Sequence, residues 1–207
     1  MPIFEKNDFI TQLDFEMLRQ VLEMQSSRLK TGKPIVPISV NFSRKHQENP
    51  GYIKQLDEIL SRYEVPTKSL EMEITESVFM YDLAPLAKSI EQLRKRGISI
   101  SIDDFGAGYS SLNVLSRVKA DSIKLDRQFI LDVETEQGNF TAEFLQLLIN
   151  MIKKLGFKVL AEGVETQEQV NMLTEAGCSY AQGYFYAKPM PVADFLKFIE
   201  EHDIEED

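Results

Sequence analysis

The chain has few of the side chains that bind soft metals or form disulfides. Its 207 residues include one cysteine, Cys178, which excludes an intrachain disulfide and a multi-cysteine metal site. Cys178 also has no histidine beside it in a motif, so we interpret it as a small buried residue rather than a nucleophile. The two histidines, His46 and His202, are too few for a histidine-rich metal centre.

Long apolar segments are also missing. No hydrophobic run approaches the length of a membrane span, and the amino terminus lacks the pattern of a signal peptide. We therefore expect a cytoplasmic location and no direct membrane contact by this segment, although other domains of a longer parent protein could anchor it.

Positive charge is scarce relative to negative charge. The 33 acidic residues outnumber the 23 lysines and arginines, and the formal charge is −10. This balance argues against nucleic-acid polymers and anionic membranes as partners. A phosphate-bearing substrate would need local cations, and a divalent metal and a placed lysine are the obvious sources. Part of the negative charge lies in residues 200–207, which we expect to form a solvated acidic tail.

Short apolar runs alternate with longer segments of helical periodicity, and no linker or low-complexity tract separates them. The runs are rich in Ile, Val and Leu, which is typical of strands covered on both faces. The predicted strands are Ile35–Val40, Leu70–Ile74, Ile98–Ile102, Ser122–Leu125, Lys158–Ala161 and Ala181–Phe185. This order predicts one α/β domain with a parallel sheet, either a barrel or an open doubly wound sheet.

Helix boundaries are also visible in the sequence. Thr166 and Gln169 have the spacing of a capping box, and Gly177 is expected to end the same helix. Gly97 and Gly156 each follow a pair of basic residues, which is typical of a last helical turn and its terminating glycine. One helix is expected to bury a stripe made of Phe140, Phe144, Leu147, Leu148, Met151, Ile152 and Leu155.

Polar residues end or follow every predicted strand. They are Asn41, Glu73, Glu76, Asp103, Asp104, Lys124, Asp126, Glu162, Glu165 and Gln182. In a parallel barrel the carboxyl ends of all strands meet on one face, which is where active sites lie. One such residue could be a helix cap, but six strands in succession predict a functional site.

The residue types at these strand ends favour a hard divalent cation. Asn41, Glu73, Asp103 and Asp104 offer only oxygen, which Mg²⁺ and Mn²⁺ prefer and structural zinc does not. Adjacent aspartates can serve two metals, and two metals clamp a phosphodiester and acidify a bridging water. Lys124 among several carboxylates is suited to orient a phosphate or the attacking water.

Simpler interpretations of single residues remain open. Asp103-Asp104 could cap a turn, and Glu165 could be an exposed acid in the first turn of a helix. Gln182 could be a core amide and Lys124 a surface lysine. The triplet Asp104-Phe105-Gly106 also matches a kinase motif, but no glycine-rich loop or His-Arg-Asp loop accompanies it.

Six strings of residues contain the strand-end positions. They are Ser39-Val40-Asn41-Phe42-Ser43, Glu73-Ile74-Thr75-Glu76-Ser77, Asp103-Asp104-Phe105-Gly106-Ala107-Gly108-Tyr109-Ser110-Ser111-Leu112, Ile123-Lys124-Leu125-Asp126, Ala161-Glu162-Gly163-Val164-Glu165-Thr166 and Gln182-Gly183-Tyr184. In this order and at this spacing they closely resemble the motifs of EAL domains. The resemblance runs from about the amino terminus to Pro191.

The resemblance implies a TIM-like (β/α) barrel that hydrolyses cyclic di-GMP to linear pGpG with Mg²⁺ or Mn²⁺. By position, the implied metal ligands are Asn41, Glu73 and Asp103, with Asp104 on a second metal. Lys124 resembles the lysine that holds the catalytic water.

The resemblance also implies roles for the remaining strand-end residues. Glu162 resembles the residue proposed as general base or metal ligand, and Glu76 the glutamate that anchors the Asp103–Ser111 loop. Glu165, Gln182 and Asp126 resemble residues that line the site near the metals.

The sequence departs from the family at the namesake motif. The family's Glu-Ala-Leu lies on an early strand, before a stretch similar to Pro2–Ile10, and the 207 residues contain no such motif. We therefore expect an incomplete barrel that lacks the first strands, forming one partial EAL domain over residues 1–207.

We also expect slow or absent hydrolysis. The alternative hypothesis is a degenerate EAL module that binds cyclic di-GMP or a protein without catalysis. Open sheet edges and the family's own dimerisation predict a homodimer.

Overall fold

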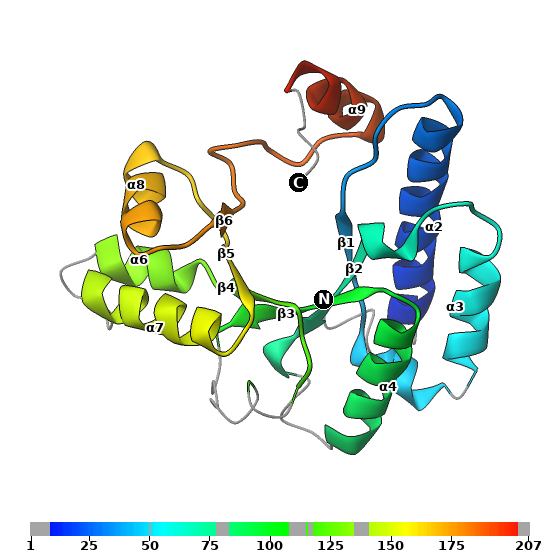
Figure 1. The fold of residues 1–207 in the computed structure, drawn as a ribbon, viewed down its shortest axis with the longest axis horizontal. Helices are drawn as coiled ribbons and strands as arrows, with labels where there is room; N and C mark the ends of the chain where they lie inside the picture. The colour runs from blue at the N-terminus through cyan, green and yellow to red at the C-terminus, as the bar shows by residue number, and fades with distance from the viewer. Residues whose placement is uncertain are drawn as a thin grey trace.

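The protein is built on one curved parallel sheet. The computed structural model describes residues 9–49, 51–77, 83–107, 115, 118–134 and 141–202. In this part of the chain six strands lie in the order β1-β2-β3-β4-β5-β6, and each pairs in parallel with the next. Helices lie along the outer side of the sheet (Figure 1). Sequential parallel strands with outer helices form part of a barrel. The predicted incomplete TIM-like barrel is confirmed.

The elements have the following bounds. The strands are β1 (Ile38–Asn41), β2 (Leu70–Thr75), β3 (Ser99–Phe105), β4 (Ser122–Leu125), β5 (Lys158–Ala161) and β6 (Tyr180–Ala181). The α-helices are α2 (Phe9–Lys30), α3 (Tyr52–Leu60), α4 (Leu83–Lys95), α6 (Gln128–Glu134), α7 (Ala142–Lys154), α8 (Gln167–Glu175) and α9 (Val192–Glu201), and the 3₁₀ helices are η1 (Arg44–Glu48) and η2 (Thr67–Ser69). None of the described helices is both long and apolar enough to cross a membrane.

The strands are apolar on one face only. In β2, Leu70, Met72 and Ile74 are each 1% exposed, and they alternate with Glu71 and Glu73. The expectation of strands covered on both faces holds in part, since Ser101 and Lys124 on the other face are buried too, but that face is polar. Helices cover only the outer side, which we call the helix face, while the opposite side, the lumen face, carries serines, carboxylates and lysines.

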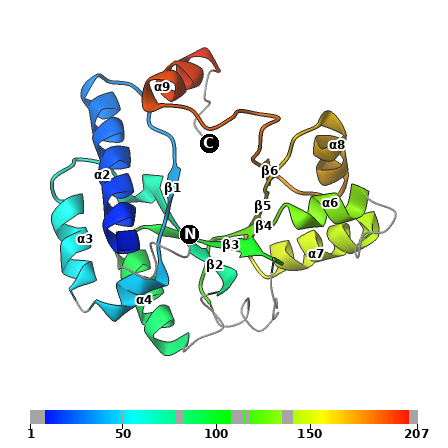
Figure 2. The same cartoon turned by 180° about the vertical axis from the view of Figure 1, so that it is seen from behind.

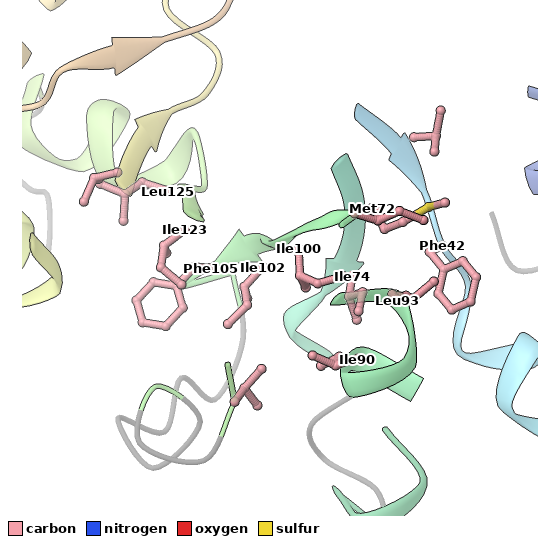
Figure 3. Close-up of a cluster of buried hydrophobic side chains, with 14 of the residues drawn as sticks. Phe42, Met72, Ile74, Ile90, Leu93, Ile100, Ile102, Phe105, Ile123 and Leu125 are labelled. Carbon is pink, nitrogen blue, oxygen red and sulfur yellow. The ribbon is translucent and has the colours of Figure 1, made fainter. Parts of the chain in front are cut away.

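The helix face forms the hydrophobic core. Ile100, Ile102 and Ile123 are fully buried, as is Leu93 of α4. Figure 3 shows Ile100 and Leu93 between β3 and α4, and Ile123 farther along the sheet beside Phe105. Burial of an isoleucine or leucine contributes roughly 1.5–3 kcal/mol, so this face accounts for most of the stabilisation of the sheet.

Two strands differ in extent from the prediction. β1 begins at Ile38 rather than Ile35, because Pro37 has no N–H to join the ladder. β6 contains only Tyr180–Ala181 rather than Ala181–Phe185. After β6 the chain bonds instead to the loop that follows β5, where the Phe185 N–H donates to the Val164 carbonyl over 3.0 Å.

The predicted helix ends are confirmed. Thr166 and Gln169 form a capping box at the start of α8. The terminating glycines Gly97, Gly156 and Gly177 all have positive φ, between 79° and 94°.

The predicted buried stripe on α7 was right in part, because Leu148, Met151 and Ile152 lie in the core or pack against it. Phe144, Leu147 and Leu155 are 42%, 68% and 55% exposed. The residues of α7 that are buried are Leu145, Ile149 and Ile152. Because α7 is apolar on more than one side, periodicity alone could not show which side faces the sheet. Phe140 lies outside the described residues.

The start of the predicted acidic tail belongs to a helix. Glu200 and Glu201 form the end of α9, and Glu200 pairs with Lys33 and lies 3.9 Å from Arg28 Nη1. Both views show α9 beside the carboxyl end of α2 (Figure 1, Figure 2). Glu200 and Glu201 are exposed, as expected for solvated residues, but they are helical rather than part of a tail, and residues 203–207 lie outside the described part.

Candidate active site

Four neighbouring strands direct polar side chains to the lumen face near their carboxyl ends. Glu73 is on β2, Asp103 on β3 and Lys124 on β4, and Glu162 directly follows β5. The register pairs Thr75 with Asp103 and Lys124 with Leu160, which brings the ends of these strands to one level. The predicted convergence of strand-end residues is thus observed for these four.

Lys124 is the centre of this cluster. Its Nζ atom lies 2.7 Å from Glu73 Oε1, 2.6 Å from Glu162 Oε1 and 3.1 Å from Asp103 Oδ1. The residue is only 4% exposed. Burial by itself lowers the pKa of Lys124, but the surrounding carboxylates outweigh burial and raise the pKa well above the ordinary value. Lys124 therefore stays an ammonium, which can donate hydrogen bonds and cannot act as a base.

A bulge in β3 turns two consecutive aspartates toward the same region. The register of β3 against β4 shifts between Ile102 and Phe105, and Asp104 has a φ of 54°, the left-handed conformation that few residues other than glycine adopt. In a regular strand Asp103 and Asp104 would point to opposite faces. Here Asp103, Asp104 and Glu162 each offer an oxygen, and these atoms all lie within 4.8 Å of one another.

One oxygen of this cluster lacks a hydrogen bond. Asp103 Oδ1 is buried and accepts no hydrogen bond, although it lies 3.1 Å from Lys124 Nζ. The distance makes this contact an ion pair, but its direction does not suit a hydrogen bond. A buried carboxylate oxygen that accepts no hydrogen bond would be stabilised by a further positive charge. The donor set, which is all oxygen, therefore fits Mg²⁺ or Mn²⁺.

Two carboxyl groups of the cluster have raised pKa values. Burial raises the pKa of Glu162, and Asp103 and Glu73 add to the rise, although Lys124 opposes it. Partial burial also raises the pKa of Asp104, with further contributions from Asp103 and Asp126. Both shifts arise mainly from burial, with a smaller contribution from repulsion between neighbouring carboxylates, which a divalent cation relieves.

Glu76 holds the segment that follows the two aspartates. Its Oε2 atom accepts a hydrogen bond of 3.0 Å from the Gly106 N–H, and the residue is 7% exposed. Gly106 has a φ of 98°, and a Cβ atom there would lie 2.0 Å from the Phe129 ring. Only glycine fits this position. The loop's later residues, including Ser111, lie outside the described part.

A groove of about 630 Å³ lies beside the cluster. Its polar lining includes Asp126, Arg127, Glu162, Glu165, Gln182 and Lys188, and Phe195 and Phe198 of α9 contribute apolar surface. Gln182 Nε2 donates to Glu162 Oε1 over 2.6 Å, and Arg127 pairs with Glu165 at 2.9 Å. Asp126 also accepts from the Gln128 N–H at the start of α6.

The structure supports Asn41 as a site residue less directly than it supports the other candidates. It ends β1 in register with Glu73, and its side chain is exposed. Sequence reasoning missed Arg127 and Glu71. Arg127 directly follows a motif string that ends in Asp126. Glu71 lies two residues before Glu73 and therefore on the same face of β2, where it accepts a hydrogen bond from Ser122.

The fold and site together define a half-barrel with an oxygen-rich site at the ends of its strands. The sequence model of the EAL domain family matches residues 1–189, so the chain belongs to the EAL domain family.

Individual relatives agree with this assignment. The cyclic di-GMP phosphodiesterase NbdA of Pseudomonas aeruginosa is 36% identical over 195 residues, which cover 94% of this chain and 25% of NbdA. The structure of the PaMucR phosphodiesterase in complex with c-di-GMP superposes with a TM-score of 0.84 at 34% identity, covering 94% of this chain and 78% of that one. The manganese and cyclic-di-GMP complex of Klebsiella pneumoniae BlrP1 has a TM-score of 0.75 at 27% identity, covering 86% and 45%. The chain thus spans about a quarter of the length of NbdA.

Proposed function

We propose that this chain carries the site of a metal-dependent phosphodiesterase that hydrolyses cyclic di-GMP to linear pGpG. The observation that carries the proposal is Lys124, buried within 3.1 Å of the carboxylates of Glu73, Asp103 and Glu162. Membership of the EAL family and the names of NbdA and PaMucR support the substrate and the reaction.

The metal would be held by oxygen ligands. We assign Asn41, Glu73, Asp103 and Asp104 to Mg²⁺ or Mn²⁺, and the manganese of the BlrP1 complex supports a metal of this class. When bound, such cations supply positive charge to the phosphodiester and acidify water at the site.

Lys124 and Glu162 would act on the attacking water. Because the Lys124 ammonium remains protonated, it donates a hydrogen bond that holds the water and balances developing negative charge. Glu162 has a raised pKa and a second contact with Gln182, which suits it to accept a proton. In the reaction the water oxygen bonds to phosphorus, and the bond from phosphorus to the ribose 3′ oxygen breaks. The proton that Glu162 takes from the water balances the proton that the 3′ oxygen gains from solvent as it leaves as a hydroxyl.

The remaining candidates would shape the site around the dinucleotide. Glu76 is proposed to anchor the loop that begins at Asp103, through its bond to Gly106. Gln182, Glu165 and Asp126 are proposed to line the groove in which the substrate lies.

Two measurements on the purified chain test the proposal. The chain is incubated with cyclic di-GMP and Mn²⁺, and pGpG is separated by chromatography, with the PaMucR phosphodiesterase as reference. Because the 207 residues contain no Glu-Ala-Leu motif, we expect slow turnover. Asp103→Asn should weaken Mn²⁺ binding in calorimetry. An Asp103→Asn isotherm identical to that of the parent would contradict the ligand assignment, and nucleotide binding without any pGpG would favour the non-catalytic module.

We also propose that the chain associates as a homodimer. In the described part of the sheet, β1 and β6 each pair with one neighbour, and open edges with unpaired N–H and C=O groups recruit another chain. Multi-angle light scattering should give a mass near twice 23.8 kDa. A constant mass of 23.8 kDa across micromolar concentrations would contradict the dimer.

A further inference from the structure

Helix α2 is joined to the sheet by two buried polar contacts, one near each end of the strands. Near the amino ends, Gln25 Nε2 donates to the Val36 carbonyl over 2.8 Å, and the Ser69 hydroxyl donates to Gln25 Oε1 over 2.9 Å. Near the carboxyl end of β1, Asp14 contacts the turn that leads into η1. The second contact therefore lies on the side of the sheet where the site is.

Asp14 holds this turn through a single oxygen. Its Oδ2 atom accepts from the Ser43 N–H over 2.9 Å and lies 3.0 Å from His46 Nε2. Asp14 is 7% exposed and His46 is 1% exposed. His46 Nδ1 is buried without a hydrogen-bond partner, so the ring proton belongs on Nε2, where Asp14 accepts it.

Aromatic stacking extends this contact to the residue next to Asn41. The His46 ring stacks on Phe42 with a centroid distance of 4.4 Å and an interplanar angle of 11°. Phe15 of α2 also contacts the His46 ring, in an edge-on arrangement with a centroid distance of 4.7 Å. The Phe42 N–H in turn donates to the Glu73 carbonyl over 2.9 Å. Both residues after Asn41, Phe42 and Ser43, are thus held by the pair of Asp14 and His46.

This support matters because of where Asn41 lies. β1 pairs with β2 and with no other strand in the described part, so the sheet holds Asn41 from one side only. The Asn41 side chain is exposed, whereas the Phe42 and His46 rings behind it are buried. The direction of its amide therefore depends on the backbone that follows it.

We propose that Asp14 and His46 are positioning residues for the metal site, which fix the turn after β1 and so direct the Asn41 amide toward Glu73. The inference rests on the proposed function, because it takes Asn41 as a metal ligand. Neither residue is proposed as a metal ligand. Partners that orient ligands from outside the coordination shell commonly change metal affinity about 10- to 100-fold.

The test compares Mn²⁺ affinity among variants that remain folded by circular dichroism. His46→Leu replaces the imidazole, which donates to Asp14, with an apolar side chain of similar length. It should raise the Mn²⁺ Kd about tenfold. His46→Gln, which keeps a donor amide, should recover most of the affinity. Ser69→Ala is the matched control, because it breaks the other buried contact of α2. It should lower the melting temperature and leave the Mn²⁺ Kd unchanged.

A double-mutant cycle separates positioning from general destabilisation. If His46 acts through Asn41, then His46→Leu should cause no further loss of Mn²⁺ affinity when Asn41 is already alanine. Equal losses in both backgrounds, or an unchanged Kd with a lowered melting temperature, would overturn the inference. If His46→Leu does not fold, Asp14→Asn takes its place in the same cycle, with the same expectation.

Failure of the inference and failure of the proposed function give different results. When Asp103→Asn weakens Mn²⁺ binding and His46→Leu does not, the positioning role is wrong and the metal site stands. When Asp103→Asn and Asn41→Ala both leave the Mn²⁺ Kd unchanged, the proposed metal site is wrong and the inference is overturned with it.

Discussion

The two faces of the sheet are stabilised in opposite ways. On the helix face, Ile100, Ile102 and Ile123 are fully buried in an apolar core, where each lost methylene leaves a cavity. On the lumen face, one ammonium from Lys124 is surrounded by the carboxylates of Glu73, Asp103 and Glu162. The first face is stabilised by burial alone, whereas the second has more negative than positive charge, so an added divalent cation should stabilise it further.

Because the two faces differ, residues that determine stability alternate with residues that determine function within single strands. Successive residues of β2 and β4 point to opposite faces, so a substitution at one position should affect either the core or the site. Changes on the helix face should alter the free energy of unfolding without changing metal affinity. Changes on the lumen face should alter metal affinity, pH dependence and turnover together.

The largest effect is expected for Lys124→Met, which removes the shared cation of the lumen face. Turnover of cyclic di-GMP should fall about 10²–10³-fold, because the water and the developing charge lose their donor. The metal-free protein should lose about 3–5 kcal/mol of stability, because three buried carboxylates are left uncompensated, and Mn²⁺ should recover part of this loss. Assays of pGpG formation and urea unfolding measure both effects. Lys119→Met, at an exposed position, is the control. Unaltered turnover in Lys124→Met would show that the ammonium is not part of the site.

On the helix face, Ile100→Ala should cost about 2–5 kcal/mol of unfolding free energy. It should leave the Mn²⁺ Kd unchanged, since Ile100 points away from the lumen. Leu147→Ala on α7 is the matched control, because Leu147 is 68% exposed and should shift stability by less than about 0.5 kcal/mol. Urea unfolding and calorimetry on the same samples test the separation. If Ile100→Ala lost as much metal affinity as Asp103→Asn, the proposed separation of stability from metal affinity between the two faces would be wrong.

The pH dependence of stability should also distinguish the faces. Folding raises the pKa values of Glu71, Asp104 and Glu162, so the folded state favours their protonated forms. Their contribution to stability is present below the ordinary carboxyl pKa and is lost as the pH rises through the raised values.

These three groups should therefore make the melting temperature of the metal-free protein fall as pH rises through this window, whereas Asp57, whose pKa is lowered by its hydrogen bond to Arg96, acts in the opposite direction. Mn²⁺ requires ionised ligands, so its stabilising effect should grow in the same direction. Thermal unfolding over a pH series, with and without Mn²⁺, measures both trends. The raised pKa of Glu71 would be contradicted if Glu71→Gln left the pH dependence of melting in the metal-free protein unchanged.

The smallest effect is expected for Glu71→Gln, deeper on the lumen face. Burial, opposed by the Ser122 hydrogen bond and reinforced by Glu73, raises the pKa of Glu71. The amide keeps an acceptor for Ser122 and removes one negative charge, so the metal-free protein should gain no more than about 1 kcal/mol. Glu71→Ala is the control, since it leaves the Ser122 hydroxyl without its acceptor and should destabilise. A loss of stability in Glu71→Gln would mean that the Glu71 charge is needed.

Much of the fold could be predicted because local patterns specify it. The capping box at Thr166 and the terminating glycines place helix ends to within a residue or two. The alternation in Leu70–Thr75 was also available in the sequence, and it already indicates a strand with one polar face. The strand-end positions of Glu73, Asp103 and Lys124 followed from the order of apolar runs.

Other features depended on contacts between distant segments. Which side of α7 faces the sheet was predicted only in part, because several of its sides are apolar. The pair of Asp14 and His46 was not predicted either, since the two residues are 32 positions apart and meet only when α2 packs on β1.

The sequence by itself determined the kind of protein: sequential parallel strands, a family with six ordered motifs, and an oxygen-only set of strand-end side chains. These depend on residue type and short-range periodicity, which can be read along the chain. Only the tertiary structure decided that a bulge at Asp104 turns two aspartates toward Glu162, and that Lys124 is shared by three carboxylates. The physical reason is that such contacts depend on the register between strands and on local backbone conformation, which arise only when the separate elements assemble.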